Sequence, residues 1–275
     1  MLVNLNDVLK DARDKKYAVG LFNTTDTDML EAAISAAEET RSPIIIGTAE
    51  VLLPYGELKL IAPSMIAAAK RASVPVVVHF DHGLTFERCM EALKLGFSSI
   101  MFDGSLGGEE ENIKKTAEMV KIAHALGATV EGEIGHVGQA DADDNSKEDL
   151  YTTVEEAVSF AEKTGVDALA IAIGTAHGAY KSKPILQIER LKEIRAALDT
   201  PLVLHGGSGL SDDDFKNAIN GGIAKMNIFT DLCVAGKNAF KTFDGEYLEI
   251  RNKKVEAIKE AVKKKIMLFG SVGKA

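Results

Sequence analysis

Three histidines share one local setting, in which a run of apolar or small residues comes shortly before and a glycine follows at once. They are His82, His177 and His205. Imidazole is a common zinc ligand, and three protein ligands with an open fourth position are typical of a catalytic zinc site. A single histidine of this kind is more simply explained by a bond to a nearby carbonyl group. Three in the same setting favour a metal site.

Carboxylate residues lie at the ends of several apolar runs, where they can accept or donate protons. Asp81 directly precedes His82. A carboxylate buried beside a metal can hold or deliver a proton, so Asp81 is a candidate general acid–base residue. Asp103 and Glu133 end two other runs. They can orient the histidine ligands or hold a second metal, although ion pairs with lysines of the fold explain them equally well.

A glycine-rich turn after His205 has the composition of a phosphate site. The residues that can contribute are Gly206, Gly207 and Ser208, together with Asn227, Ile228, Phe229 and Thr230 where a later helix is predicted to begin. Backbone N–H groups at such turns and helix starts bind phosphate, and α/β barrels hold phosphate most often after their seventh and eighth strands. A tight turn before a helix is the simpler explanation of the motif alone. Its position after the seventh predicted strand favours phosphate.

The elements that position these residues alternate regularly. Eight short apolar or small-residue runs each lead into a segment with apolar residues at helical spacing. The predicted strands are Tyr17–Asn23, Pro43–Gly47, Pro75–His79, Ser98–Asp103, Thr129–Glu133, Asp167–Gly174, Pro201–His205 and Ile223–Ile228. This alternation predicts an α/β fold with a parallel sheet closed into a (β/α)8 TIM barrel, whose strand ends share one mouth. An open doubly wound sheet is the rival, but it would rarely reach eight units at this length without a break.

Helix boundaries carry suitable residues. The predicted N-caps are Thr85, Thr153 and Ser211, and the glycines at predicted helix ends are Gly96, Gly127, Gly165 and Gly221. A helical pattern from Val255 to Leu268 follows the eighth strand and has no ninth strand after it. We therefore expect an additional C-terminal helix packed on the barrel or on a partner subunit. No linker or composition shift divides residues 1–275, which predicts a single domain.

One connection is unusually long. Residues Gly135 to Asp149 show no apolar period and include an acidic, polar stretch. Loops of this length inside compact barrels are usually functional lids or disordered segments.

Composition narrows the partners and the compartment. The 275 residues carry a formal net charge of −9, which argues against nucleic acid or an anionic membrane as the main partner. Cys89 and Cys233 form no C-x-x-C pair, which favours a reducing compartment. The first residues lack the apolar core of a signal peptide, and no stretch reaches transmembrane length. We expect a cytoplasmic protein.

Over nearly its whole length the chain resembles the class II, zinc-dependent aldolases that act on fructose and tagatose bisphosphates. The most specific segments are His79 to Gly83, Glu131 to Gly135, Ala172 to Gly178, Leu204 to Gly209 and Lys225 to Asn227. The resemblance implies that His82, His177 and His205 bind zinc and that Asp81 moves the proton of the C4 hydroxyl. It also implies that Gly178, Gly206 to Ser208 and Asn227 to Thr230 contact dihydroxyacetone phosphate. A homo-oligomer, dimer or tetramer, and a monovalent cation (Na⁺ or K⁺) near the phosphate are further implications.

The chain departs from the family pattern at three places, one of which is Phe229-Thr230, where relatives often have Ala-Thr. Relatives usually place a glutamate in the long loop, whereas this chain has Asp141, which we expect to exchange the proton on the carbon of dihydroxyacetone phosphate. The Asp-Pro-Arg pattern often found near the second phosphate is absent between Asp244 and Arg251. The expected reaction is reversible cleavage of a ketose 1,6-bisphosphate to dihydroxyacetone phosphate and an aldehyde such as glyceraldehyde 3-phosphate. The identity of the aldehyde half of the substrate is not fixed by the sequence, and 5-dehydro-2-deoxygluconate 6-phosphate is an alternative substrate.

Two other functions compete with a zinc aldolase. Lys225, on the eighth predicted strand, is the candidate nucleophile of a Schiff-base aldolase, but that mechanism does not explain three histidines at strand ends. The second alternative is a sugar-phosphate-binding protein that has lost catalytic turnover. Asp141 in place of the usual glutamate suggests it, since a fold does not guarantee an activity.

Overall fold

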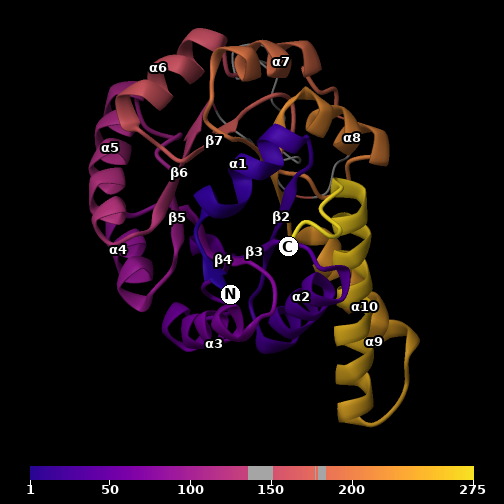
Figure 1. Ribbon diagram of the computed structural model, residues 1–275. Helices are drawn as coiled ribbons and strands as arrows, with labels where there is room; N and C mark the ends of the chain where they lie inside the picture. The colour runs from indigo at the N-terminus through magenta and orange to yellow at the C-terminus, as the bar shows by residue number, and fades with distance from the viewer. Residues whose placement is uncertain (136–150, 177, 179–183) are drawn as a thin grey trace.

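The computed structural model describes residues 1–135, 151–176, 178 and 184–275, and its centre is a ring of parallel strands (Figure 1). The ring strands are β2 (Val19–Asn23), β3 (Ile44–Ala49), β4 (Val76–Gly83), β5 (Ser99–Phe102), β6 (Thr129–Ile134), β7 (Ala168–Ile171), β8 (Leu202–Leu204) and β9 (Ile223–Ile228). Pairing of β2 with β9 closes the sheet. The predicted (β/α)8 barrel is confirmed.

All eight predicted strands coincide with ring strands, but the first residues hold an element that the sequence did not reveal. The short strand β1 (Leu2–Val3) pairs with the start of β4. It leads into helix α1 (Leu5–Lys15), which lies across the end of the barrel in Figure 1. Its buried residues Leu5, Val8, Leu9 and Ala12 pack with strand residues inside the ring. The N-terminal segment therefore plugs the amino-terminal end of the barrel.

Side chains inside the ring form an apolar layer below and a polar layer above. Leu21, Val77 and Val203 belong to the apolar cluster that α1 covers. Because side chains of one strand face return every second residue, the next inward positions toward the carboxyl end are Asn23, His79 and His205. The alternation that fills the core thus also delivers polar groups to the open end of the barrel.

Helices surround the ring and bury one face each against it. They are α2 (Thr27–Thr40), α3 (Leu58–Arg71), α4 (Phe86–Leu95), α5 (Glu109–Ala125), α6 (Val154–Thr164), α7 (Ile188–Ala197) and α8 (Asp212–Gly221), with a short 3-10 helix η1 (Glu50–Leu52) after β3. The predicted caps Thr85, Thr153 and Ser211 each accept a bond from the backbone of their helix. Helix α8 ends one residue later than expected, with Gly222 in place of Gly221 in the capping position.

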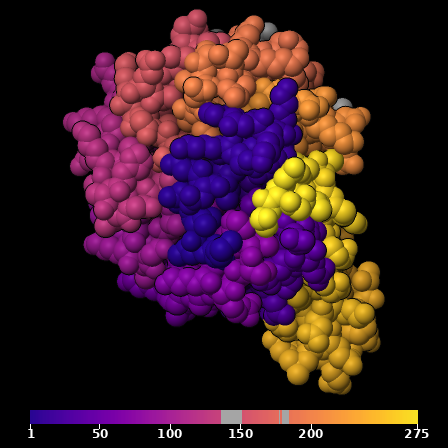
Figure 2. Space-filling view, viewed as in Figure 1, coloured from indigo at the N-terminus to yellow at the C-terminus, as the bar shows by residue number. Residues whose placement is uncertain are grey.

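The C-terminal region extends beyond the ring as a pair of helices, α9 (Thr230–Thr242) and α10 (Tyr247–Phe269). Figure 2 shows the outer part of this pair projecting from the barrel. Helix α10 packs on α2, where Lys254 Nζ lies 2.9 Å from Asp26 Oδ2 and Arg251 Nε lies 2.9 Å from Asp28 Oδ1. The additional C-terminal helix is therefore confirmed, and it begins eight residues before the predicted Val255. Within the described part of the chain, no helix is long and apolar enough to cross a membrane.

Candidate active site

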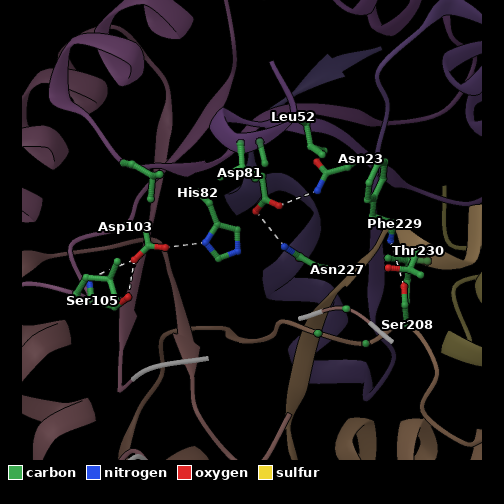
Figure 3. A pocket seen from close by; sticks show the side chains of 18 residues that line it. Asn23, Leu52, Asp81, His82, Asp103, Ser105, Ser208, Asn227, Phe229 and Thr230 are labelled. Atoms are coloured by element: carbon green, nitrogen blue, oxygen red, sulfur yellow. Dashed lines mark hydrogen bonds and ion pairs between the residues drawn. The ribbon is translucent and has the colours of Figure 1, made fainter. Parts of the chain in front are cut away.

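A cavity of about 450 Å³ opens at the carboxyl-terminal ends of the strands. Residues from seven of the eight strand-end regions line it, among them Asn23, Asp81, Asp103, Gly206 and Asn227. Figure 3 shows Asp81 and His82 in the middle, with Asp103 and Ser105 on one side and Ser208 and Thr230 on the other. In α/β barrels this end carries the active site.

The end of β4 presents two neighbouring residues to the same cavity, although neighbours on a regular strand point to opposite faces. Its register with β5 shifts between Phe80 and Gly83, and the backbone of His82 has φ = 43°. This irregularity brings both Asp81 and His82 to the cavity. A side chain at Gly83 would press on the Cys89 sulfur and a backbone carbonyl, so only glycine fits after the bulge.

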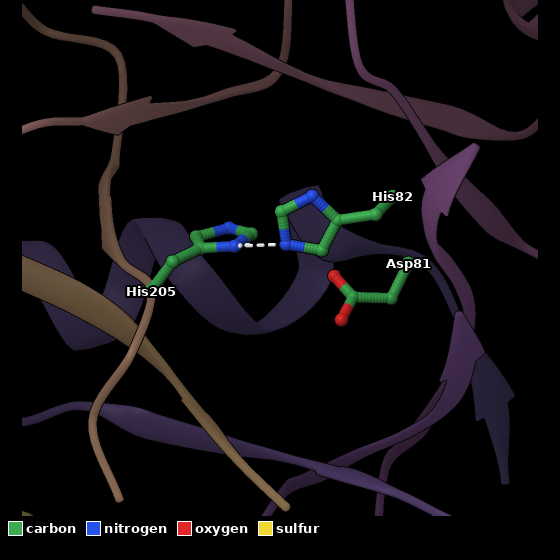
Figure 4. Close-up of side chains that lie close together, drawn as sticks. All are labelled: Asp81, His82 and His205. Carbon is green, nitrogen blue, oxygen red and sulfur yellow. Dashed lines mark hydrogen bonds between the residues drawn. The ribbon is translucent and has the colours of Figure 1, made fainter. Parts of the chain in front are cut away.

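The two described histidines of the predicted metal site face each other. His205 Nδ1 lies 2.6 Å from His82 Nε2, as drawn in Figure 4. The other nitrogen of each ring bonds a carboxylate: His82 Nδ1 lies 2.7 Å from Asp103 Oδ2, and His205 Nε2 lies 2.8 Å from Glu131 Oε1. Each ring is therefore held in orientation from behind by a carboxylate.

Asp81 is held between two amides. Asn23 donates to Asp81 Oδ2 at 2.8 Å, and Asn227 donates to Oδ1 at 2.9 Å. Lys225 donates to the Asn227 side-chain oxygen at 2.7 Å, and its Nζ lies 2.9 Å from Glu131 Oε2. The carboxylate of Asp81 is fixed in position by a network that runs through the interior of the barrel.

Neighbouring charges set the protonation of this cluster. Burial would raise the pKa of Asp81, but His82 and Lys225 hold it well below its usual range. Burial would lower the pKa of His82, but Asp81 and Asp103 raise it to about 9. Burial lowers the pKa of His205, and His82 acts in the same direction. Asp81 is consequently ionised at neutral pH.

The donor set fits a transition-metal cation. Asp81, His82 and His205 each place a ligand atom within 4.8 Å of the others. Imidazoles backed by carboxylates, as His82 is by Asp103 and His205 by Glu131, are characteristic of metal-binding histidines. His82, Asp103 and Glu133 form a second group with ligand atoms equally close. Asp103 thus lies where it can orient His82, and the group with Glu133 matches the predicted secondary position.

The predicted phosphate residues line the same cavity on the side of β8 and β9. They are Gly178, Gly206, Gly207, Ser208, Asn227, Ile228, Phe229 and Thr230. The Ser208 hydroxyl accepts from the backbone N–H groups of Phe229, at 3.3 Å, and Asp231, at 3.5 Å, so the glycine-rich turn sits on the start of α9. Gly206 has φ = 65°, and a side chain there would collide with the Ala176 carbonyl. The tight turn and the helix start together form a cradle of backbone groups.

Two predicted site residues cannot be placed, and two contributors were missed. His177 and Asp141 lie outside the described residues. Asn23, Glu131 and Lys225 hold the histidines and Asp81, but the sequence singled out neither Asn23 nor Glu131 for the site and offered Lys225 only as a nucleophile. A signal existed for Glu131, since it stands two residues before Glu133 in one strand and must share its face.

The Schiff-base alternative does not fit the position of Lys225. Its ammonium group is fully buried between Glu131 and Asn227, and Lys225 is absent from the residues that line the cavity. A substrate carbonyl in the cavity would have to displace this ion pair to reach it.

The closed parallel barrel thus gathers an imidazole–carboxylate cluster and a glycine-rich turn at one mouth, the end at which α/β barrels carry their active sites. The sequence matches the family described as "Fructose-bisphosphate aldolase class-II" over residues 3–274. The chain belongs to this family and is an aldolase. Family members depend on a metal ion.

Individual relatives align from end to end. The chain is 42% identical over 277 residues to "Uncharacterized protein YdjI" of Escherichia coli (strain K12), with 100% of both chains covered. It is 40% identical over 310 residues to "Fructose-bisphosphate aldolase" of Thermus caldophilus, again with 100% of both covered. The crystal structure of the YdjI aldolase from Escherichia coli K12 superposes with a TM-score of 0.91 at 40% identity, covering 100% of both chains. A putative fructose-1,6-biphosphate aldolase from Coccidioides immitis gives a TM-score of 0.90 at 29% identity, covering 98% of this chain and 97% of that one.

Proposed function

We propose that the protein is a zinc-dependent aldolase that reversibly cleaves a phosphorylated ketose to dihydroxyacetone phosphate and an aldehyde. The observation that carries this proposal is the position of Asp81. Its ionised carboxylate is clamped by Asn23 and Asn227 beside the facing His82 and His205, in a cavity whose other side is the glycine-rich cradle. The proposed proton acceptor, the proposed metal ligand His82 and the proposed phosphate cradle thus border the same cavity.

The proton steps follow from the charge of Asp81. In cleavage its carboxylate takes the C4 hydroxyl proton, the C3–C4 bond breaks, and the electron pair stays with the dihydroxyacetone phosphate half. In condensation the same group returns the proton to the aldehyde oxygen. A bound metal supplies positive charge beside the substrate carbonyl, where negative charge develops. Asp141 remains the predicted base for exchange at the carbon of dihydroxyacetone phosphate.

The proposed metal ligands are His82, His177 and His205. Two observations support zinc: the ligand atoms are imidazole nitrogens, which suit zinc, and both described imidazoles have a carboxylate behind them. Asp103 and Glu133 are the proposed orienting or second-metal residues. A monovalent cation near the phosphate stays a prediction from the family resemblance.

We propose that the phosphate of dihydroxyacetone phosphate lies in the cradle formed by Gly178, Gly206 to Ser208 and Asn227 to Thr230. Backbone N–H groups and the positive end of α9 favour an anion there. The loops are those after β7, β8 and β9, which is where α/β barrels usually hold phosphate.

The experiment that tests the function is cleavage of a small panel, with and without chelator. Fructose 1,6-bisphosphate and tagatose 1,6-bisphosphate are included because the family resemblance predicts them, and 5-dehydro-2-deoxygluconate 6-phosphate is the alternative. Cleavage that chelator abolishes and zinc restores supports the proposal. If the protein binds zinc but cleaves none of the three compounds and catalyses no condensation with dihydroxyacetone phosphate, the non-catalytic sugar-phosphate-binding alternative is supported. The predictions of a homo-oligomer and of a cytoplasmic location are untested.

A further inference from the structure

Across from the phosphate cradle, the wall of the cavity carries large apolar side chains beside Asp103 and Ser105. In the closed ring, β3, β4 and β5 lie across from β7, β8 and β9. The loops after the first three strands contribute Val51, Leu52, Leu84 and Leu106 to the cavity lining. Val51, Leu84 and Leu106 are 60%, 44% and 79% exposed. Large apolar side chains therefore line the entrance on the side that must receive the aldehyde half of the substrate.

The described part of this wall offers a phosphate no lysine or arginine side chain. Among the described residues that line the cavity there is no lysine or arginine, whereas Asp81 and Asp103 are carboxylates. A phosphate of charge near −2 placed close to carboxylates in a partly desolvated cleft is repelled. The described charges thus disfavour a second phosphate at this end.

The backbone anion site on this side is already filled by the protein itself. At the start of α4, Glu50 Oε2 accepts from the backbone N–H groups of Leu84, at 2.8 Å, and Thr85, at 3.1 Å. The Thr85 hydroxyl also donates to Glu50, at 3.1 Å. These N–H groups belong to the N-cap Thr85 and the residue before it, and they lead into α4; backbone N–H groups in such a position can otherwise hold a phosphate. Their engagement by Glu50 leaves a negative charge where a phosphate group would need donors.

Arg88, a basic residue at the start of α4, is paired with a carboxylate elsewhere. Arg88 lies with Glu50 in a neighbouring shallow depression, and its guanidinium is 2.5 Å from Glu91. It does not line the cavity.

From these observations we propose that the aldehyde half of the substrate carries no phosphate, so that the substrate is a ketose 1-monophosphate with an uncharged chain. This rests on the proposed aldolase function and replaces the second phosphate that the family resemblance implies. The C–H faces of the chain lie on Val51, Leu52, Leu84 and Leu106. In condensation, the carbon of dihydroxyacetone phosphate loses one proton and bonds to the aldehyde carbon, and the aldehyde oxygen gains one proton from Asp81. No further reactant is needed.

The test compares aldehydes in condensation with dihydroxyacetone phosphate, using the zinc-loaded full chain. The acceptors are glyceraldehyde, propanal and glyceraldehyde 3-phosphate, and kcat/KM is measured for each. The expected result is that kcat/KM for glyceraldehyde exceeds that for glyceraldehyde 3-phosphate by at least about tenfold, since one charge interaction alters a rate by that much or more.

Two variants at the exposed Val51 test the cause of the preference. Val51→Arg adds a cation to the wall, and Val51→Gln adds a side chain of comparable length without charge. The ratio of kcat/KM for glyceraldehyde 3-phosphate to that for glyceraldehyde should rise about tenfold in Val51→Arg relative to Val51→Gln. Equal ratios in the two variants would overturn the assignment of this wall to the aldehyde chain.

Solvent deuterium exchange into dihydroxyacetone phosphate, measured without any aldehyde, distinguishes failure of the proposed aldolase function from failure of the uncharged-aldehyde inference. Exchange together with a preference for glyceraldehyde 3-phosphate overturns the uncharged-aldehyde inference and leaves the aldolase function standing. Zinc binding with neither exchange nor condensation overturns both.

Discussion

Replacement of Glu131 by glutamine removes one charge from the centre of the buried network. Glu131 and Lys225 are both fully buried, with Nζ of the lysine 2.9 Å from Glu131 Oε2. Breaking a buried ion pair by removing one partner costs about 3–5 kcal/mol, because the remaining charge is left uncompensated. We expect Glu131→Gln to lower the free energy of unfolding by that amount, a large part of the ~5–15 kcal/mol typical of a domain.

The same change should weaken metal binding independently of stability. Glu131 Oε1 bonds His205 Nε2 at 2.8 Å and so fixes which ring nitrogen faces His82. Loss of such an outer carboxylate typically lowers metal affinity about 10–100-fold. Urea unfolding of the metal-free protein measures the first effect, and competition with a chromophoric zinc chelator measures the second.

Two control variants separate these effects. Glu131→Gln combined with Lys225→Met removes both charges, and should recover most of the lost stability while zinc affinity stays low. Glu39→Gln removes an exposed carboxylate that pairs with Lys259 and Lys263 at 3.0 Å, and should cost below about 1 kcal/mol. A Glu131→Gln protein as stable as the wild type, or a double variant with wild-type zinc affinity, would refute the role assigned to the network.

Four further outcomes are expected. Asp81→Asn should lower kcat for cleavage about 10²–10⁴-fold, with a small change in KM, because proton transfer is lost; a steady-state assay checks this, and a near-wild-type kcat would contradict it. Gly83→Ala should destabilise the protein by about 1–3 kcal/mol in urea unfolding, since the added methyl meets the Cys89 sulfur; an unchanged midpoint would count against the packing described. A thiol reagent at pH 8 should label the exposed Cys233 and spare Cys89, whose thiol pKa is raised by burial; mass spectrometry of the labelled peptides decides. Neighbouring Lys225 and His205 outweigh burial and lower the pKa of Glu131 from 4.5 to about 2. The contribution of ionised Glu131 to the free energy of unfolding is therefore complete above pH 4.5 and lost as pH falls toward 2. The difference in unfolding free energy between wild type and Glu131→Gln should shrink over that range, and a constant difference would contradict this.

Periodicity was sufficient to predict the barrel, because most strands are apolar runs flanked by turn residues and several helices begin at a capping residue. Thr153 and Ser211 were predicted as caps and are caps. The plug at the amino-terminal end was not predicted, since β1 has only two residues and gives no measurable alternation. Its packing depends on contacts between Leu5 or Leu9 and strands far along the chain.

The candidate site was predictable in its residue types and not in its connections. Histidine before glycine at strand ends pointed to His82 and His205, and the structure places their rings edge to face, with His205 Nδ1 2.6 Å from His82 Nε2. The irregular backbone at His82, which turns two neighbours toward the same space, follows from packing against β5 and has no local sequence rule. The pairing of Glu131 with Lys225 was not predicted because the two residues lie on distant strands, so that only the closed ring reveals the pair.

The central claim is metal-dependent carbon–carbon bond chemistry at the cavity of Asp81, His82 and His205. The most direct measurement is condensation of dihydroxyacetone phosphate with glyceraldehyde and with glyceraldehyde 3-phosphate by chelator-treated protein as zinc is titrated back. The account predicts no activity before zinc is added and a linear rise that saturates near about one equivalent per chain. Activity that survives removal of the metal, or zinc bound at full occupancy with neither acceptor converted, would contradict it.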